Sequence, residues 1–558
     1  MFQKVTHMKI AIAQINPVIG DFEYNFNLIK SFAGKAIKQN CDLVVFPELS
    51  VTGYPPRDLL EKKDFIEANL SYLSRLVDEI RGIGVICGFA DKADEGNLLY
   101  NSAVLFENGK ILHKTNKRLL PTYDVFDESR YFEAGAEFAP YSYKDKIIGI
   151  AICEDAWNDD NSSGEKKYHL NPVSLMIKNG ANLIINISAS PFHMGKQQFR
   201  QNMFGAIARK YKVPFIFANQ VGGNDSVLFD GTSAVFDTNG RIIALARDFD
   251  QDLIFYDTDN PSGNLLQENM HPVSASNTEA VLKALVMGTR DYVTKCGFSK
   301  VVLGLSGGID SAITAFIAAQ AIGPENVLTV FMPSSYTSKE NYGDTQKLAQ
   351  NIGTKYEIIP IDSVFEGFLK LVSPSFKQNE PEVTEQNIQA RIRGTILMAL
   401  SNRENRILLS TGNKSELAVG YCTLYGDMNG GLAVISDIPK TIVYEISHFI
   451  NRSKETIPAN IIKKAPSAEL KPDQTDQDDL PPYDLLDAIL KGYIEDLKGA
   501  KELIAQGFDA KTVKDVILRV DRNEYKRHQA APGLKVTSKA FGYGRRYPLA
   551  QRYTQRDI

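Results

Sequence analysis

The sequence has few cysteines, no long hydrophobic run and no excess of charge of one sign. Its five cysteines are odd in number and show no CxxC spacing. This pattern argues against a disulfide scaffold or a zinc site and favours a reducing compartment. No apolar run is long enough for a transmembrane helix. Lys+Arg 63 against Asp+Glu 67 gives a net charge of −4. There is thus no global basic surplus for nucleic acid, which leaves open a local basic site for a phosphorylated small molecule.

The N-terminus lacks the features of a targeting segment. Residues 1–7 have no apolar core of the kind found in signal peptides, and the first strand-like run begins at Met8. We expect these residues to be an extension or an alternative start, and we expect a cytoplasmic location. With 43% hydrophobic and 23% charged residues, the composition is that of a globular protein with more than one core, which excludes a disordered or low-complexity chain.

The first half of the chain alternates predicted strands and helices. Its short runs rich in Ile and Val are typical of strands buried on both faces: 8–14, 42–47, 83–89, 147–152 and 181–188. Asn239-Gly240 predicts a hairpin between two further runs, 233–238 and 241–247. Helical spacing appears from Lys196 to Lys210. These patterns together predict an α/β domain.

The second half contains a second α/β unit. The pattern dissolves at 258–276, which predicts a linker, and a helix is expected to start near Asn277. Predicted strands then alternate with helices, at 301–305, 327–332, 356–361 and 407–410. This alternation favours a parallel, doubly wound sheet. The acidic, proline-rich segment 467–484 fits either a solvated surface loop or a lid over a phosphate site.

The strongest local signal is LGLSGGIDSA at 303–312. A strand runs into a glycine-rich turn, and a helix-like run follows. Glycines let backbone N–H groups approach an anion, and the helix N-terminus adds partial positive charge. The loop is not a Walker motif, because no GK[ST] follows. Asp310 stands where a carboxylate can hold Mg²⁺ against a pyrophosphate.

This loop resembles the pyrophosphate loop of the ATP pyrophosphatases. These enzymes adenylate a carboxyl or carbonyl oxygen, release pyrophosphate and let ammonia displace AMP. NAD synthetases, GMP synthetases and asparagine synthetases share the loop, so it indicates the reaction and not the substrate. Four further segments are similar to NAD synthetases: 386–394, 410–424, 438–441 and 524–533.

The resemblance to NAD synthetases implies two sets of binding residues. Those implied to bind ATP are Gly304, Leu305, Ser306, Gly307, Gly308, Ile309, Asp310, Ser311, Thr411, Lys440 and Ser467. Those implied to line the deamido-NAD site are Asn387, Glu416, Tyr421, Cys422, Thr423, Leu424 and Lys526. The implied Mg²⁺ ligands are Asp310 and Glu416. Without the resemblance, Glu416 and Lys440 would each be taken for surface charges.

Three separated residues carry the signal of the first half. Glu48 and Cys153 each end an apolar strand, and Lys117 stands among turn residues. Taken singly, the cysteine is explained as a packed thiol and the other two as a surface ion pair. Together they match the Glu–Lys–Cys arrangement of the nitrilase (carbon–nitrogen hydrolase) superfamily, and this resemblance covers about residues 8–257.

The nitrilase resemblance implies a glutaminase. Cys153 would attack the side-chain amide carbon of glutamine, with Glu48 as general base. Lys117 would stabilise the tetrahedral oxyanion and favour the thiolate. Glu128 resembles an extra carboxylate that some relatives place near this triad, and a simple Glu128–Arg130 surface pair is equally open.

The same resemblance implies that Tyr123, Ser190 and Lys196 hold the glutamine. Some relatives have an arginine at the position of Lys196. Lysine keeps the charge but loses the bidentate recognition of a carboxylate.

The predicted fold is therefore an N-terminal nitrilase-like α/β sandwich, 8–257, a linker, 258–276, and a doubly wound parallel-sheet ATP-pyrophosphatase domain, 277–558. The fusion implies synthesis of NAD⁺ from deamido-NAD, ATP and glutamine, with Mg²⁺ bridging ATP phosphates. The family implies a homo-oligomer, and no nucleic-acid or membrane partner is expected. Two alternatives stay open: an amidotransferase for another carboxylate, and a non-enzymatic nucleotide-binding or scaffolding protein that kept the fold.

Overall fold

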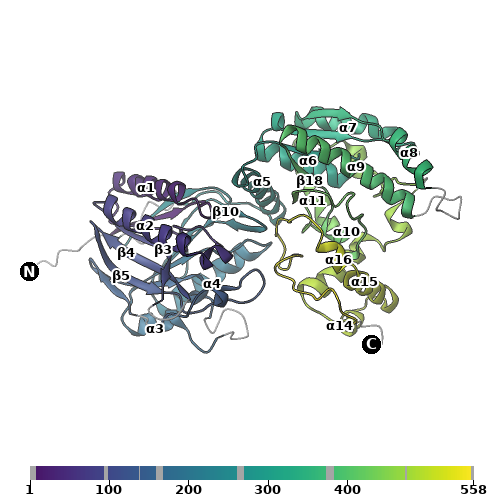
Figure 1. The fold of residues 1–558 in the computed structure, drawn as a ribbon. Coiled ribbons are helices and arrows are strands. Elements are labelled where there is room, and N and C mark those ends of the chain that lie inside the picture. Colours follow the sequence, from purple (N-terminus) through teal and green to yellow (C-terminus); the bar gives the residue numbers. More distant parts are fainter. Residues whose placement is uncertain are drawn as a thin grey trace, which may run out of the picture. The chain divides into compact units, whose positions relative to one another are not determined.

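The computed structural model describes residues 8–93, 98–136, 139–158, 168–259, 269–372, 383–471 and 474–553. The chain divides into two compact units, Met1–Ala275 and Ser276–Ile558 (Figure 1). The expected extension at residues 1–7 and positions 260–268 of the predicted linker lie outside the described residues.

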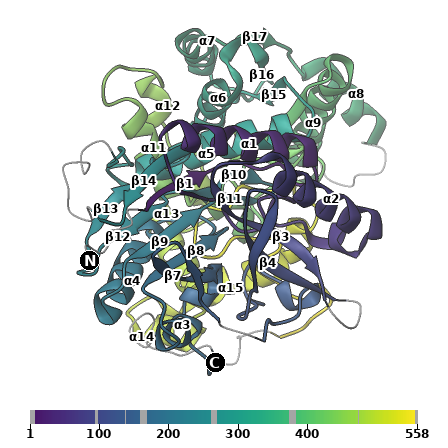
Figure 2. The same ribbon diagram turned by 90° about the vertical axis from the view of Figure 1, so that its left-hand side faces the viewer.

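Two six-stranded sheets form the centre of the first unit (Figure 2). One has the order β14-β1-β2-β3-β4-β5, the other β13-β12-β9-β8-β7-β6, and β10 and β11 form a separate ribbon. The strands are β1 Lys9–Gln14, β2 Leu43–Val45, β3 Gly84–Lys92, β4 Leu99–Glu107, β5 Lys110–Asn116, β6 Tyr141–Tyr143, β7 Lys146–Ile152, β8 Leu183–Ser188, β9 Phe215–Asn219, β10 Val221–Asn224, β11 Val227–Asp230, β12 Ala234–Phe236, β13 Ile242–Leu245 and β14 Asp252–Asp257. The antiparallel pair β12–β13 is the predicted Asn-Gly hairpin.

One hydrophobic core lies between the two sheets. It takes residues from both, such as Ile10 and Ile86 of the first and Ile150 and Ile185 of the second. The outer face of the first sheet packs on helices α1 (Phe22–Lys38) and α2 (Lys63–Glu79), and that of the second on α3 (Pro172–Lys178) and α4 (Lys196–Tyr211). The unit is thus the predicted α/β sandwich, and burial on both faces explains the unbroken Ile and Val runs.

The described end of the predicted linker is tied to the first unit. Leu245 N–H donates to the carbonyl of Asn269 at 2.8 Å, and Ser274 N–H donates to Asp248 Oδ2 at 2.7 Å. These bonds extend the ordered contacts of the sandwich beyond residue 257.

The second unit is built on a five-stranded parallel sheet with the order β17-β16-β15-β18-β19. Its strands are β15 Val301–Gly304, β16 Val327–Phe331, β17 Lys355–Ile358, β18 Ile407–Ser410 and β19 Leu432–Ala433. The predicted parallel sheet is confirmed, although the two residues of β19 are too short to leave a sequence signal. The chain order reverses between β15 and β18, and such a switch point opens a crevice at the carboxyl ends of the strands.

Some helices of the second unit cover this sheet, and others form a helical part beside it (Figure 1). They are α5 Asn277–Lys295, α6 Ile309–Ile322, α7 Glu340–Ile352, α8 Asp362–Val372, α9 Val383–Glu404, α10 Lys414–Val419, α11 Lys440–Ile450, α12 Ala459–Lys463, α13 Tyr483–Leu490, α14 Ala500–Ala505, α15 Ala510–Arg522 and α16 Glu524–Arg527. A second core joins α10, α13 and α15 through Ala418, Leu486 and Val516. No helix in the described part of the chain is long and apolar enough to cross a membrane.

Candidate active sites

Glu48, Lys117 and Cys153 meet in the interior of the first unit. Lys117 Nζ donates to Glu48 Oε1 at 2.7 Å, and both side chains are fully buried. Cys153 follows β7 and is buried too, with a backbone φ of +44°. Positive φ is uncommon for a residue other than glycine and often marks a functional turn.

The electrostatics leave the thiol protonated at rest. Burial raises the pKa of Cys153 well above its ordinary value, Glu48 adds to the rise, and Lys117 opposes it without prevailing. Burial alone would lower the pKa of Lys117, but the carboxylates of Glu128 and Glu48 hold it well above its usual range. The ammonium therefore stays charged, and the thiol needs a base before it can act as a nucleophile.

Glu128 belongs to the same cluster. Its Oε1 accepts hydrogen bonds from Lys117 at 2.8 Å and from the Tyr54 hydroxyl at 2.9 Å. Burial, only partly offset by Lys117, raises the pKa of Glu128 to about 7. Arg130 instead pairs with Asp58, with 3.6 Å between Nε and Oδ1, so the alternative of a Glu128–Arg130 surface pair is wrong.

Further hydrogen bonds hold the cluster in place. Asn101 Nδ2 donates to Glu48 Oε1 at 2.7 Å, and Ala189 N–H donates to Glu48 Oε2 at 2.9 Å. Asp155, in the turn that Cys153 begins, accepts from the backbone N–H of Leu119 at 2.9 Å. Glu48 and the turn that Cys153 begins are therefore both fixed by neighbours.

Tyr123 contacts a buried carboxyl group next to Cys153. Its hydroxyl donates to Glu154, with 2.9 Å to each carboxylate oxygen. The Tyr168 hydroxyl approaches Glu154 Oε1 at 3.2 Å. Glu154 is thus a buried carboxyl group held by two phenol groups.

Ser190 and Lys196 are close to each other in the sequence but differ in their surroundings. Ser190 is buried, and its carbonyl accepts from Arg200 Nη1 at 3.3 Å. Lys196 is the first residue of α4, and its ammonium lies 5.2 Å from the centre of the Trp157 ring.

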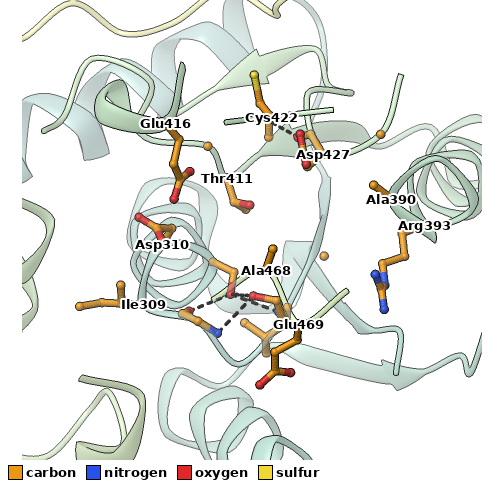
Figure 3. Close-up of a pocket in the computed structure, with 18 of the residues that line it drawn as sticks. Ile309, Asp310, Ala390, Arg393, Thr411, Glu416, Cys422, Asp427, Ala468 and Glu469 are labelled. Atoms are coloured by element: carbon orange, nitrogen blue, oxygen red, sulfur yellow. Dashed lines mark hydrogen bonds between the residues drawn. The ribbon is translucent and has the colours of Figure 1, made fainter. Parts of the chain in front are cut away.

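The second unit contains a cavity of about 300 Å³ at the carboxyl ends of β15, β16 and β18 (Figure 3). Every residue predicted to bind ATP lines it: Gly304, Leu305, Ser306, Gly307, Gly308, Ile309, Asp310, Ser311, Thr411, Lys440 and Ser467. Gly307 has a φ of +88°, and a Cβ there would lie 2.5 Å from Asn341 Cγ, so the turn requires glycine. Helix α6 begins directly after the turn, which places its positive end at the cavity.

Two carboxylates and one ammonium form the polar end of this cavity. Lys440 Nζ lies 2.5 Å from Asp310 Oδ2 and 3.3 Å from Glu416 Oε1. Asn413 joins them, because its amide donates to Asp310 at 2.9 Å while its oxygen caps α10 by accepting from Glu416 N–H at 2.9 Å. Figure 3 shows the side chains of Asp310 and Glu416 next to each other.

The residues predicted for deamido-NAD fall into two groups. Those that line the cavity are Glu416, Tyr421 and Cys422; Asn387, Thr423, Leu424 and Lys526 do not line it. The second group nevertheless holds the edge of the cavity. Thr423 Oγ1 donates to Asn387 Oδ1 at 2.8 Å, and Lys526 Nζ donates to the carbonyls of Gly420 and Cys422, both at 2.8 Å.

The described part of segment 467–484 also reaches the cavity. Ser467, Glu469 and Asp476 are among its lining residues. Asn341 Nδ2 donates to the carbonyl of Ser306 at 3.1 Å and to Glu469 Oε2 at 2.8 Å. A covering segment over the phosphate loop is therefore favoured over a solvated surface loop.

The sequence relatives identify the family. Residues 9–263 match the carbon–nitrogen hydrolase family, and residues 281–530 match the NAD synthase family. Glutamine-dependent NAD(+) synthetases from Synechocystis sp. and Thermotoga maritima are 45% and 43% identical to the chain, over 98% of its length and 99% of theirs. The chain belongs to the glutamine-dependent NAD(+) synthetase family.

Solved structures of this family agree with the fold. The glutamine-dependent NAD+ synthetase from Acinetobacter baumannii in complex with ADP is 40% identical, with a TM-score of 0.77 over 98% of both chains. The synthetase from Cytophaga hutchinsonii, at 22% identity, shares the fold with a TM-score of 0.83 over 98% of both chains. The predicted family, fold class and enzyme class, an ATP-dependent amidating ligase, are confirmed. The comparisons support neither alternative, a ligase for another carboxylate or a non-enzymatic protein.

ATP-dependent NAD(+) synthesis implies Mg²⁺, and the acidic end of the cavity suits this ion. Burial, reinforced by Asp310 and opposed by Lys440, raises the pKa of Glu416 to about 8. Asp476 adds a third buried carboxylate to the lining. Within the described ranges no group of three or more His, Cys, Asp or Glu side chains forms a cage for a metal ion. Mg²⁺ characteristically takes one or two carboxylates and completes its shell with phosphates and water, so Asp310 and Glu416 fit it.

The sequence patterns did not single out several residues of both sites. Tyr54 contacts Glu128, Asn101 contacts Glu48, and Asn413 links the segments of the two acidic residues of the cavity. Asn413 lies in the 410–424 segment, three residues before Glu416, which is the spacing of a capping box. That spacing could have identified Asn413, whereas the other two depend on contacts between segments that are distant in the sequence.

Proposed function

We propose that the chain makes NAD⁺ in two half-reactions. The first unit hydrolyses glutamine to glutamate and ammonia at Cys153. The second uses ATP to activate the carboxyl group of deamido-NAD, and ammonia then replaces AMP. The observation that supports this best is the fully buried Glu48–Lys117 pair at 2.7 Å, beside a buried cysteine. Burying a charged ammonium group carries a large desolvation cost, and such buried charges are typical of catalytic centres.

In the glutaminase, each member of the cluster has one task. Glu48 takes the thiol proton, and Cys153 Sγ attacks the amide carbon. The Lys117 ammonium, charged because two carboxylates surround it, stabilises the oxyanion of the tetrahedral intermediate. Glu48 passes the proton to the departing ammonia, and water hydrolyses the thioester to glutamate. Glu128 keeps Lys117 charged and in place.

Glutamine offers an ammonium and a carboxylate that need opposite partners. Glu154 is a buried carboxylate adjacent to the nucleophile, with only phenol hydroxyls as its hydrogen-bond partners among the described side chains. It therefore suits the α-ammonium, with Tyr123 beside it. Lys196 suits the α-carboxylate, and Ser190 supplies a further polar group.

In the second unit the glycine-rich turn and the start of α6 bind the ATP phosphates. Lys440 contributes positive charge, and Thr411 and Ser467 complete the ATP set. Asp310 and Glu416 would hold Mg²⁺, which supplies charge neutralisation on the phosphates when bound. A carboxylate oxygen of deamido-NAD attacks the α-phosphorus, diphosphate leaves, and ammonia attacks the adenylated carbonyl carbon to release AMP.

We assign the deamido-NAD site to the edge of the same cavity. Glu416, Tyr421 and Cys422 line it directly. Asn387, Thr423, Leu424 and Lys526 complete the set: Thr423 bonds to Asn387, and Lys526 bonds to the backbone carbonyl of Cys422. The domain limits 8–257 and 277–558, with a linker at 258–276, a homo-oligomer and a cytoplasmic location complete the proposal.

The decisive experiment separates the two nitrogen sources. Cys153→Ala should make no NAD⁺ from glutamine, because the nucleophile is gone, and should keep near-normal synthesis from ammonium. Cys41→Ala, which alters another buried thiol of the same unit, should keep both activities. Steady-state NAD⁺ and AMP formation provides the readout. Glutamine-dependent synthesis by Cys153→Ala would exclude Cys153 as the nucleophile.

A further inference from the structure

Asp155 holds the backbone that follows Lys117. Its Oδ1 accepts hydrogen bonds from the N–H groups of Arg118 at 3.0 Å and Leu119 at 2.9 Å. The side chain is buried. Burial raises the pKa of Asp155 to about 6, against the opposing effects of backbone hydrogen bonds and of the Lys117 charge. The carboxyl group is therefore ionised near neutral pH, where both of its oxygens can accept hydrogen bonds.

The second oxygen of Asp155 holds the backbone that precedes Cys153. Asp155 Oδ2 accepts from the N–H of Ile152 at 3.1 Å. After the cysteine, the Asn186 side-chain amide donates to the Cys153 carbonyl at 3.1 Å. The positive φ of Cys153 is a costly conformation that persists only where neighbours fix it. These two bonds fix the backbone on both sides of the thiol.

Lys117 and Cys153 belong to different sheets of the first unit. Lys117 follows β5 of the first sheet, whereas Cys153 follows β7 of the second. The core between these sheets is apolar, and apolar contacts are non-directional, whereas hydrogen bonds have a preferred geometry. The bonds of Asp155 therefore supply a directional connection between the ammonium and the thiol across the two sheets. The bond from Ala189 to Glu48 does the same for the general base.

We propose that Asp155 is a positioning residue of the glutaminase, which sets the Lys117 ammonium against the Cys153 thiol. The inference rests on the proposed roles of Lys117 and Cys153. Lys117 stabilises the oxyanion only if its ammonium lies beside the carbonyl oxygen of the glutamine that Cys153 attacks. A misplacement of about 1 Å can lower the rate of such a reaction about 100-fold. Asp155 acts through the backbone of both segments and not on the glutamine itself.

Asp155→Asn tests this connection, because an amide keeps one acceptor oxygen and presents donors in place of the other. The amide can serve Ile152 or the Lys117 segment, but not both. We expect the kcat for glutamate release to fall about 10- to 100-fold. The KM for glutamine and NAD⁺ synthesis from ammonium should change little. Alkylation of Cys153 by a diazoketone analogue of glutamine should reach the same end point as in the unmodified chain, which separates slower sites from fewer folded sites.

Asp237→Asn is the matched control, and a double variant gives the specific readout. Asp237 is buried in the β12–β13 hairpin, where it accepts from the N–H groups of Asn239 at 2.8 Å and Arg241 at 2.9 Å. Its replacement should lower the Tm without changing kcat. If Asp155 acts through Lys117, the variant with both Asp155→Asn and Lys117→Met should hydrolyse glutamine about as fast as Lys117→Met alone. Thermal unfolding of each variant checks the fold.

Three results would overturn the inference. The first is an unchanged kcat in a folded Asp155→Asn variant, which decides the question even if the double variant does not fold. The second is a pair of losses that multiply in the double variant, because Asp155 would then act independently of Lys117. The third is a lower end point of alkylation that accounts for the fall in kcat, which would make Asp155 purely structural. Glutaminase activity retained by Cys153→Ala or Lys117→Met would instead reject the proposed function.

Discussion

Replacing Lys117 with methionine should destabilise the first unit and stop glutamine hydrolysis. Its ammonium lies 2.7 Å from Glu48 and 2.8 Å from Glu128, and its side chain is fully buried. Methionine fills a similar volume, so the main loss is electrostatic. Removing one partner of a buried ion pair costs about 3–5 kcal/mol. In a unit of this size that loss lowers the Tm by roughly 6–20 °C.

The loss should depend on pH. Glu128 already has its pKa raised to about 7 by burial against the opposing effect of Lys117, and removing the ammonium raises it further. When the pKa of a carboxyl group is higher in the folded than in the unfolded state, the free energy of unfolding falls as the pH rises towards the folded-state pKa. The deficit of Lys117→Met against the unmodified chain should therefore grow between about pH 5 and about pH 8.

Thermal unfolding at both pH values and glutamate release measure the two effects. Loss of one oxyanion-stabilising group typically lowers the rate about 100- to 1000-fold. The matched control is Lys114→Met, three residues earlier, where the lysine is 47% exposed and pairs with Asp91. Such an exposed pair contributes at most about 1 kcal/mol. If Lys117→Met unfolded at the same temperature as Lys114→Met, or kept glutaminase activity, the electrostatic reasoning would be refuted.

Three other substitutions address the second unit. Asp310→Asn should abolish NAD⁺ formation from both glutamine and ammonium, because an amide binds Mg²⁺ poorly, while glutamate release survives; near-normal synthesis at limiting Mg²⁺ would remove Asp310 from the metal site. Lys526→Ala should raise the KM for deamido-NAD about 10-fold and that for ATP less, because Lys526 holds the carbonyl of Cys422; the opposite order would place it on ATP. Glu416→Gln should gain Tm relative to the unmodified chain as the pH rises from about 5 to about 8. Burial raises the pKa of Glu416 to about 8, so its ionisation destabilises the fold; a constant Tm difference would contradict this.

Local patterns predicted the strands and the loops that carry chemistry. The loop at 303–312 combines an apolar strand, a glycine-rich turn and a helix-like run, and the structure has β15, the turn and α6 in that order. Glu48 and Cys153 each follow an apolar strand, and the carboxyl ends of strands gather functional groups. It is their joint match with Lys117 to the nitrilase arrangement that makes them candidates.

Contacts between distant segments left no local pattern. Tyr54 reaches Glu128 across 74 positions, and Arg393 reaches Met332 across 61. Such partners follow from packing of helices and strands that no single window of sequence contains. Lys526 is a further case, because it bonds to backbone carbonyls, which every residue carries.

The hydrogen bonds of the cavity separate two tasks in a way that bears on how such ligases diversify. Asp310, Asn413 and Lys440 form one bonded set at the strand ends. Asn387 with Thr423, and Lys526 with the carbonyl of Cys422, form another at the rim. Under the proposed assignment, substitutions in the rim set would alter which acid is amidated while the residues proposed for ATP stay intact. New acceptor substrates could therefore evolve without changes to the bonded set of Asp310, Asn413 and Lys440.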